Sequence, residues 1–240
     1  MLAGYVFPQN KKIRLLIFAQ GRTGSTLLES LLCSTGYFSK QGEILGIYHH
    51  VLFGPLDFVN GYAKLKKGDN FLFHAKIYQL ITPDQVYKDP EKFVHTLYRK
   101  GWKVIFLHRT NTAKQVISSQ IADARKVWHR IKSKDEDFQY TLDLNLFQEE
   151  LIEREKLSKT EWEIMSKIPH LNLNYEEALS QPKNHQQTIA DVLKFLELEP
   201  VEAKTNLRKT TDRSLSEVLT NYSEYRQLLL EKGWEKFLDE

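Results

Sequence analysis

The sequence predicts a three-layer α/β fold, in which a central, mainly parallel sheet is flanked by helices. Two short apolar runs, at 13–19 and 104–107, are typical of strands that are buried on both faces of a parallel sheet. Each run is followed by a polar turn and then by apolar residues at helical spacing. No repeat, low-complexity tract or linker interrupts the chain, so we expect residues 1–240 to form a single domain.

The first half of the chain is predicted to contain two strands and two helices. After the strand at 13–19, leucines at helical spacing between 27 and 32 indicate a helix that begins at Ser25. A weaker strand is expected at 71–78. The next helix is expected to run from Pro90 to near residue 101, because proline is favoured in the first turn of a helix and glycine just beyond the last.

The second half of the chain continues the alternation of strands and helices. The strand at 104–107 is followed by a helix at 111–130, whose apolar residues share one stripe. We then expect a mostly charged helix at 142–167, a short strand at 171–175 and a helix at 182–196. Ligands of open parallel sheets bind beyond the carboxyl ends of the strands, so this edge is the predicted binding site.

The composition limits the classes of partner. The 34 basic and 31 acidic side chains leave a net charge of only +3, which provides no broad field for gripping nucleic acid. The eight histidines and the single cysteine, Cys33, show no metal-binding spacing, so no metal is expected. One cysteine and the lack of an apolar stretch of roughly 18 residues predict a cytoplasmic protein without a membrane span. The oligomeric state stays open, because a sequence does not show which apolar side chains are exposed.

The turn after the first strand has the composition of an anion site. Gly21-Arg22-Thr23-Gly24-Ser25-Thr26 offers successive backbone N–H groups, hydroxyls and the positive end of a helix dipole, which makes the predicted fold P-loop-like. The turn is two residues shorter than the phosphate loop of kinases and lacks the lysine that precedes its Ser/Thr. Arg22 offers a bidentate guanidinium instead, so ATP is the less favoured ligand. The simpler interpretation is an ordinary turn with Ser25 as the N-cap.

A second anion site is predicted at the end of the strand at 104–107. Arg109 ends this strand, and Ser118, or Ser119 in its place, lies about two turns into the next helix. A guanidinium and a hydroxyl together suit a phosphate group. Two anion sites at neighbouring strand ends indicate a nucleotide that carries phosphates on two sides.

On these residues the chain resembles the sulfotransferase superfamily, whose members use 3'-phosphoadenosine 5'-phosphosulfate (PAPS), and in particular the bacterial carbohydrate-type group that includes trehalose sulfotransferase. The resemblance implies that Arg109 and Ser118, in "LHRTNTAKQVISS", bind the 3'-phosphate. It implies a metal-free reaction, and the segment "LRKTT" places Lys209 at the nucleotide. The residues that it assigns to the 5'-phosphosulfate are Arg22, Thr23, Gly24, Ser25 and Thr26.

Two residues are candidates for the general base that deprotonates the acceptor hydroxyl. The segment "QGEIL" places Glu43 where several members of the family have a catalytic glutamate, and Glu43 is the preferred base. His74 ranks second, because cytosolic animal sulfotransferases use a histidine from a nearby region, whereas a histidine in an apolar strand is more often a core residue. Lys76 either touches the acceptor or the sulfate or is solvated. The aromatic residues between 44 and 73 form either a sugar-binding wall or an ordinary hydrophobic loop.

The sequence therefore predicts an enzyme that moves a sulfuryl group from PAPS to a hydroxyl of a carbohydrate or other small molecule by in-line transfer. In this interpretation Arg22 and the N–H groups of the turn stabilise charge on the leaving phosphate, and Glu43 removes the acceptor proton. Two alternatives stay open. They are a P-loop kinase that uses Mg-ATP and a non-catalytic nucleotide-binding protein on the same scaffold.

Overall fold

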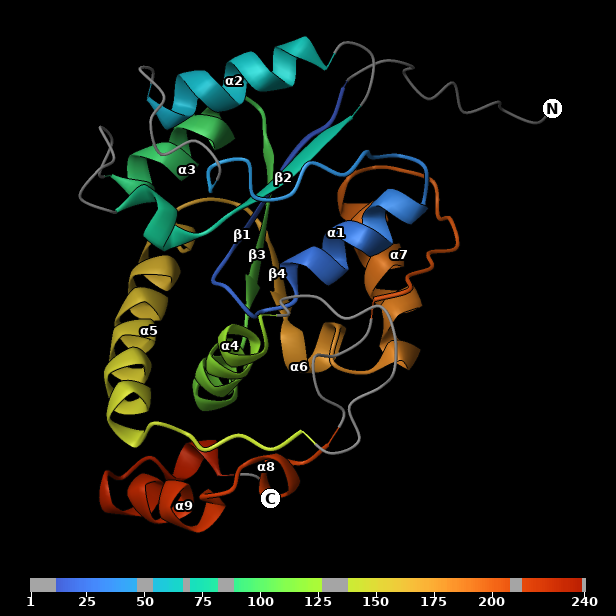
Figure 1. Ribbon diagram of the computed structural model, residues 1–240. Coiled ribbons are helices and arrows are strands. Elements are labelled where there is room, and N and C mark those ends of the chain that lie inside the picture. The colour runs from blue at the N-terminus through green and yellow to red at the C-terminus, as the bar shows by residue number, and fades with distance from the viewer. Residues whose placement is uncertain are drawn as a thin grey trace, which may run out of the picture.

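The fold is built on a parallel sheet. The computed structural model describes residues 12–46, 54–66, 70–81, 89–126, 138–207 and 213–238 (Figure 1). Within these residues, four parallel strands form one sheet in the order β2-β1-β3-β4. The strands are β1 (Arg14–Ala19), β2 (Phe71–Ala75), β3 (Lys103–His108) and β4 (Leu171–Asn174). The predicted α/β fold class is confirmed.

Helices cover both faces of this sheet. In the described part of the chain they are α1 (Ser25–Ser34), α2 (Pro55–Leu65), α3 (Pro90–Arg99), α4 (Thr112–Arg125), α5 (Leu144–Met165), α6 (Tyr175–Ala178), α7 (His185–Phe195), α8 (Leu215–Val218) and α9 (Tyr222–Glu231). Short 3-10 helices are η1 (Ile77–Leu80), η2 (Pro182–Asn184) and η3 (Glu235–Phe237). Figure 1 shows α1 and α7 on one side of the sheet and α2, α3 and α5 on the other, which makes three layers.

Side chains alternate between the two outer layers along β1. Leu15, Ile17 and Ala19 pack with residues of α1 and α7. Leu16 and Phe18 pack with residues of α2, α3 and α5. All five side chains are fully buried, as expected for a strand that is covered on both faces. A third apolar cluster joins α4, the first half of α5, α8 and α9 beyond the carboxyl ends of the strands.

The strand order brings three turns to one edge of the sheet. Because β1 lies between β2 and β3, the residues that follow these three strands are spatial neighbours. Ala19 is in register with Leu107, and Phe18 is in register with Ala75. The turn after β1 therefore lies between the residues that follow β2 and those that follow β3.

The strand predicted at 71–78 is shorter in the structure. β2 ends at Ala75 because the chain then turns into η1. The backbone N–H of Lys76 donates to Oε1 of Gln79 at 2.9 Å, and the backbone N–H of Gln79 donates to the carbonyl of Lys76 at 3.0 Å. These two bonds replace the ladder hydrogen bonds that a longer strand would need.

Two helical regions were missed by the sequence prediction. α2 lies inside the aromatic segment between 44 and 73, with Pro55 at its first position and Val59 and Ala63 buried. Its aromatic residues Phe58 and Tyr62 pack against the core, as in an ordinary hydrophobic segment. The residues at 47–53 lie outside the described part of the chain. α8 and α9, near the carboxyl terminus, were also not predicted as helices.

The helix predicted at 111–130 is described only as far as α4. α4 ends at Arg125, where Lys126 adopts a left-handed conformation with φ of 52°. Asn111 is its N-cap and accepts from the backbone N–H of Lys114 at 2.8 Å. The remainder of the predicted helix lies in residues 127–137, which are outside the described ranges.

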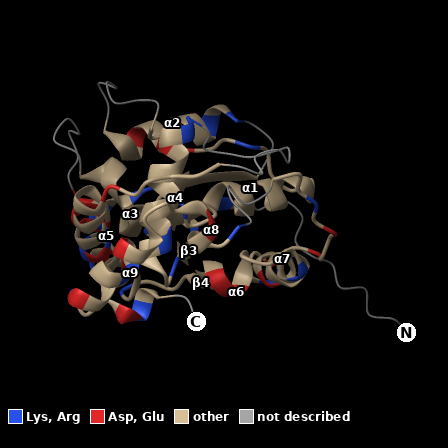
Figure 2. Ribbon diagram, turned by 60° about the horizontal axis from the view of Figure 1, so that its bottom comes forward, with Lys and Arg blue, Asp and Glu red and all other residues tan. Residues whose placement is uncertain are grey.

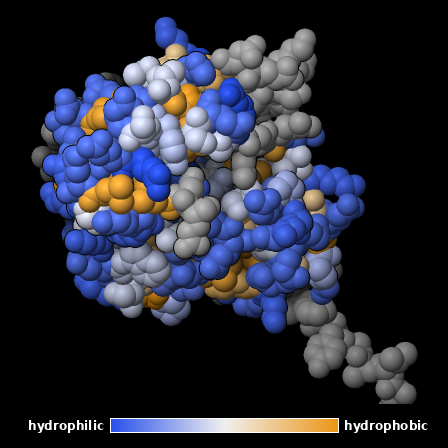
Figure 3. All heavy atoms as spheres, turned by 90° about the horizontal axis from the view of Figure 1, so that it is seen from below, coloured by the Kyte–Doolittle hydropathy of each residue, from blue (hydrophilic) through white to orange (hydrophobic). Residues whose placement is uncertain are grey.

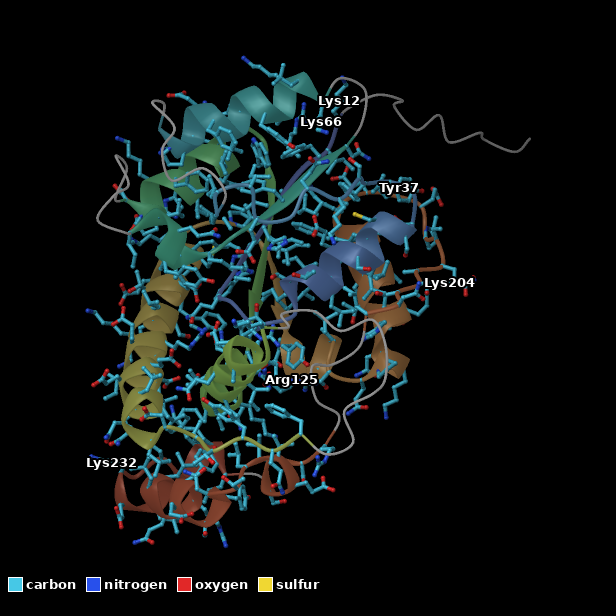
Figure 4. All side chains as sticks on the ribbon, in the orientation of Figure 1. Lys12, Tyr37, Lys66, Arg125, Lys204 and Lys232 are labelled. Carbon is cyan, nitrogen blue, oxygen red and sulfur yellow. The ribbon has the colours of Figure 1, made fainter. Side chains whose placement is uncertain are left out.

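A segment near residues 199–205 returns along α1. Tyr37 donates from its hydroxyl to the carbonyl of Glu199 at 3.2 Å, and the backbone N–H of Lys204 donates to Oγ of Ser34 at 2.8 Å. Figure 4 shows Tyr37 and Lys204 at the same end of α1. The contacts tie the chain after α7 to the helix that follows the turn.

Charged residues of both signs are interspersed over the helices in Figure 2. Figure 3, from the side of α8 and α9, shows mostly hydrophilic residues with several separate apolar patches. Among the described residues, no helix combines the length and the apolar character needed to cross a membrane.

Candidate active site

The candidate site lies at the carboxyl edge of the sheet, where the residues that follow β1, β2 and β3 meet (Figure 1). Arg109 reaches from β3 to the turn, donating from Nη1 to the carbonyl of Arg22 at 3.3 Å. Lys76 reaches from β2 to Ser25 at the start of α1. Glu43, from the segment that follows α1, lies beside Lys76. The predicted turn, the second anion site and the candidate bases are thus brought together.

The turn requires glycine at position 24. Gly24 is the N-cap of α1 and has φ of 86°, in the left-handed region that L side chains rarely adopt. A Cβ at this position would lie 2.9 Å from Cδ2 of Tyr175. Among the described residues, no side chain caps the N-terminus of α1, and the first-turn N–H groups of such a helix can bind an anion. Ser25 is therefore the first residue of the helix and does not act as its N-cap.

Carbonyl groups of the turn are held from the side of α4 and α5. Nε2 of Gln115 donates to the carbonyl of Gly21 at 2.6 Å, and Nη1 of Arg154 donates to the same oxygen at 3.3 Å. Thr23 is buried, and its hydroxyl donates to the carbonyl of Gln20 at 2.7 Å. The turn is therefore rigidly supported before any ligand binds.

The two predicted anion sites are joined by a direct contact. Nε of Arg22 donates to Oγ of Ser118 at 3.0 Å. Ser118 is the serine that faces the arginine, whereas its neighbour Ser119 is buried. Burial lowers the pKa of Arg22, and the nearby positive charge of Arg109 lowers it further. Two guanidinium groups and one hydroxyl therefore converge, which is an arrangement that suits a phosphate dianion.

Arg109 is oriented by the first two residues of α6, Tyr175 and Glu176. Its guanidinium carbon lies 4.8 Å from the centre of the Tyr175 ring. Nε of Arg109 lies 3.3 Å from Oε1 of Glu176. Glu176 also accepts from the backbone N–H groups of Thr110 and Asn111, at 3.0 and 3.3 Å. The guanidinium plane is thus held against the ring on one side, with the carboxylate at its edge.

Lys76 connects the turn to the candidate base. Its Nζ donates to Oγ of Ser25 at 2.5 Å and lies 3.7 Å from Oε1 of Glu43. The side chain is 1% exposed, so Lys76 is not solvated. Burial lowers the pKa of Lys76 to about 8, and the Glu43 carboxylate opposes this effect. An ammonium here lies between the helix N-terminus and a carboxylate.

Glu43 is the more exposed of the two candidate bases. Its side chain is 40% exposed, and Nε2 of Gln79 donates to its Oε2 at 2.9 Å. His74 is only 2% exposed and lies behind it, with Nδ1 at 3.7 Å from Oε1 of Glu43. Glu43 therefore lies at the accessible side of the site, and His74 lies behind it with Nδ1 toward the Glu43 carboxylate.

Two residues of α5 that contact the site were missed by sequence reasoning, which predicted only a mostly charged helix here. They are Arg154, which contacts the turn, and Glu161, which is buried and accepts from Nε2 of Gln20 at 3.0 Å. Burial raises the pKa of Glu161 to about 8. The two residues are seven positions apart and thus share one helix face with Phe147, and this spacing was the available signal.

Two further predicted residues are Thr26 and Lys209, and one residue beside the turn, Tyr78, was missed. Thr26 lies in the first turn of α1 and is partly exposed. Lys209 lies outside the described residues. Tyr78 of η1 was not predicted, although its hydroxyl would lie 2.9 Å from a Cβ at Gly21. Burial raises the pKa of Tyr78 to about 12, so its hydroxyl stays protonated at neutral pH beside the turn.

No protein-family model matches the chain, and no functionally curated protein is similar to it in sequence. Solved structures with distant similarity include the sulfotransferase domain of the curacin biosynthetic pathway, with a TM-score of 0.47, 11% identity, and coverage of 79% of this chain and 75% of that one. The sulfotransferase domain of the Synechococcus PCC 7002 olefin synthase has a TM-score of 0.46, 17% identity, and coverage of 90% and 85%. Shikimate kinase from Bacteroides thetaiotaomicron has a TM-score of 0.46, 10% identity, and coverage of 78% and 99%.

Proposed function

We propose that this protein is a PAPS-dependent sulfotransferase that acts on a hydroxyl of a carbohydrate or other small molecule. The observation that carries the proposal is the position of Lys76, whose ammonium bridges Ser25 of the anion-binding turn and the carboxylate of Glu43. The Lys76 ammonium thereby connects the turn, where the transferred sulfuryl group would be held, with Glu43, the proposed base. A kinase-type phosphate loop carries its lysine within the loop, whereas this cation comes from the end of β2.

The second support is the pair of arginine-lined positions at neighbouring strand ends. Arg109 and Ser118 suit the 3'-phosphate, and the turn with Arg22 suits the 5'-side of the same nucleotide. Because Nε of Arg22 contacts Ser118, this arginine belongs to both positions. We therefore assign the two anionic ends of a bisphosphorylated adenosine to these two positions.

The residues of the chain divide the chemistry of an in-line transfer. PAPS supplies the activated sulfuryl group when it is bound. The first-turn N–H groups of α1, Arg22 and Lys76 stabilise negative charge that develops on the leaving side. Glu43, oriented by Gln79 and Lys76, removes the proton of the acceptor hydroxyl as that oxygen attacks. The exposed side of Glu43 is the side from which an acceptor arrives.

A thermal-shift comparison tests the nucleotide assignment. Adenosine 3',5'-bisphosphate without metal is expected to stabilise the protein, by about 2.7 kcal/mol at a hundred times its dissociation constant. Adenosine 5'-monophosphate at the same concentration is the control that lacks the 3'-phosphate, and it is expected to stabilise the protein less. Stabilisation by Mg-ATP and not by the bisphosphate would contradict the proposal and favour a P-loop kinase.

A transfer experiment tests the catalytic assignment. The protein is incubated with radiolabelled PAPS and a panel of sugars, phenols and metabolite extracts, and the products are searched for a mass increase of one sulfuryl group. We expect at least one labelled hydroxyl compound that is absent when the protein is omitted. Tight binding of the bisphosphate without transfer to any compound would favour a non-catalytic nucleotide-binding protein.

A further inference from the structure

His74 lies between two carboxylates, those of Glu29 and of the candidate base Glu43. Its Nε2 is 3.4 Å from Oε2 of Glu29, and its Nδ1 is 3.7 Å from Oε1 of Glu43. Glu29 is completely buried, His74 is 2% exposed, and Glu43 is 40% exposed. The three side chains therefore form a row that begins in the interior of the protein and ends at the solvent-accessible face of the site.

Glu29 holds the inner end of this row and also the segment that carries Glu43. Its Oε1 accepts from the backbone N–H groups of Gln41 and Gly42, at 2.9 and 2.7 Å. The backbone N–H of His74 donates to the carbonyl of Gly42 at 3.3 Å. One carboxylate on α1 thus holds the backbone next to Glu43 and lies beside the imidazole.

The charges around His74 favour a neutral ring with its proton on Nε2. Burial alone would raise the pKa of Glu29, but the contacts with His74, Gly42 and Gln41 outweigh it and lower this pKa, so Glu29 is ionised. Burial lowers the pKa of His74, and the Lys76 ammonium lowers it further, against the effect of the two carboxylates. A neutral imidazole beside an ionised Glu29 places its N–H toward that carboxylate. The lone pair of Nδ1 then faces Glu43.

We propose that His74 is a positioning residue that receives from Glu43 the proton of the acceptor hydroxyl, with Glu29 stabilising the imidazolium that results. This inference rests on the proposed sulfotransferase function. In the step, the acceptor oxygen forms its bond to sulfur while the bond from sulfur to the leaving phosphate breaks, and the phosphate keeps the electron pair. The acceptor proton moves to Oε1 of Glu43 and then to Nδ1 of His74, so Glu43 is again a carboxylate.

The surroundings of His74 suit the transfer of a proton from Glu43 to Nδ1. Within the described part of the chain, neither ring nitrogen of His74 makes a well-aligned hydrogen bond, so Nδ1 has no competing partner. The distance of 3.7 Å between Nδ1 of His74 and Oε1 of Glu43 has to shorten by about 0.8 Å for proton transfer, so the relay requires the partly exposed Glu43 carboxylate to move toward the ring. The proton leaves by the same route after the product departs, because His74 has no other exposed neighbour in the row.

The first test needs neither donor nor acceptor. The tautomer and titration of His74 are measured by NMR in protein with 15N-labelled histidine, with the signal assigned through His74→Gln. We expect the Nε2–H tautomer at neutral pH. We expect Glu43→Gln to lower the pKa of His74, because a carboxylate that favours the imidazolium is lost. The signal of His170, which contacts the carbonyl of Ile168 away from the site, serves as the control and is expected to stay unchanged. An Nδ1–H tautomer, or a His74 signal indifferent to Glu43→Gln, would overturn the relay.

The second test separates the relay from the proposed function. In His74→Gln the amide can still contact Glu29 but cannot take up a proton from Glu43. We expect kcat for sulfuryl transfer to fall by about 100-fold or more, with the KM for PAPS and the affinity for adenosine 3',5'-bisphosphate unchanged. In the wild type, kcat is expected to rise with pH as His74 loses its proton. This rise should be absent in His74→Gln and should be present in the control variant His170→Gln. A wild-type protein that transfers no sulfuryl group would contradict the function, and an active His74→Gln with an unaltered pH profile would contradict only the relay.

Discussion

Arg22 and Ser118 are 96 residues apart in the chain, and Nε of the arginine donates to Oγ of the serine at 3.0 Å. The contact joins the turn after β1 to the helix after β3. It exists because β1 and β3 are neighbours in the sheet, which places the two strand ends side by side. The two proposed anion positions are therefore adjacent, and in the proposed function substitutions at either should act on one ligand.

Arg109→Ala is expected to weaken binding of adenosine 3',5'-bisphosphate by roughly tenfold to a hundredfold, which corresponds to about 1.5–3 kcal/mol for a hydrogen bond to a charged group. The effect on adenosine 5'-phosphosulfate, which has no 3'-phosphate, should be much smaller. Isothermal titration calorimetry with both ligands measures the difference. Arg125→Ala is the control, because Arg125 is the last residue of α4 and its guanidinium stacks on Phe138. An equal loss of affinity for both ligands would show that Arg109 does not bind the 3'-phosphate.

Glu43→Gln is expected to leave the affinity for the bisphosphate nearly unchanged and to lower kcat for sulfuryl transfer by at least 100-fold. The amide keeps the size of the side chain but does not accept the proton of a hydroxyl. Binding is measured by calorimetry and transfer with labelled PAPS. Glu163→Gln, at an exposed position of α5, is the control. Wild-type turnover in Glu43→Gln would mean that another residue is the base.

Gly24→Ala is expected to destabilise the protein by about 2 kcal/mol or more, because the new Cβ meets both an unfavourable φ and the Tyr175 ring. Gly36→Ala separates the two causes, because Gly36 also has a positive φ of 80° but no atom lies within 4 Å of a Cβ there. Its loss should be smaller, about 1 kcal/mol. Chemical denaturation measures both values. Equal losses for the two variants would show that contact with Tyr175 has no part in the requirement for glycine.

Glu161→Gln is expected to change how stability depends on pH. The pKa of Glu161 in the folded protein is about 8, whereas a glutamate in an unfolded chain titrates near about 4.3. The stabilisation from the protonated form is therefore complete below about pH 4.3 and is lost as the pH rises through about 8. The pKa of Lys76 is lowered to about 8, so this lysine makes the stability of the protein rise with pH, but only above about pH 8.

Thermal unfolding measures this dependence for the wild type and the variant. The Tm of the wild type should fall relative to that of Glu161→Gln as the pH rises from about 5 to about 8, because only the wild type has to lose a bound proton or bury a charge. Glu163→Gln, which removes an exposed carboxylate two positions away, should follow the wild type. Parallel curves for the wild type and Glu161→Gln would show that Glu161 is ionised throughout this range.

Local patterns in the sequence were sufficient for the α/β class, the strands and the turn. The apolar run of β1 is buried on both faces. Such a run predicts a buried strand even when the elements that pack against it are not known. Gly24 and Arg22 could be proposed as site residues because a strand, a glycine turn and a helix form one continuous segment. Arg109 could be proposed because the end of a strand in a parallel sheet lies at a predictable edge.

The tertiary structure alone decided which charged side chains are buried and what they meet. Lys76 contacts Ser25 across 51 residues, and Arg154 contacts Gly21 across 133 residues. A lysine or an arginine looks the same in a sequence whether it is solvated or buried, because its state depends on packing against distant elements. The order of the strands, which no local pattern encodes, brings Glu29, His74 and Glu43 into one row. In this row Glu43 is exposed to solvent, and His74 and Glu29 lie buried behind it.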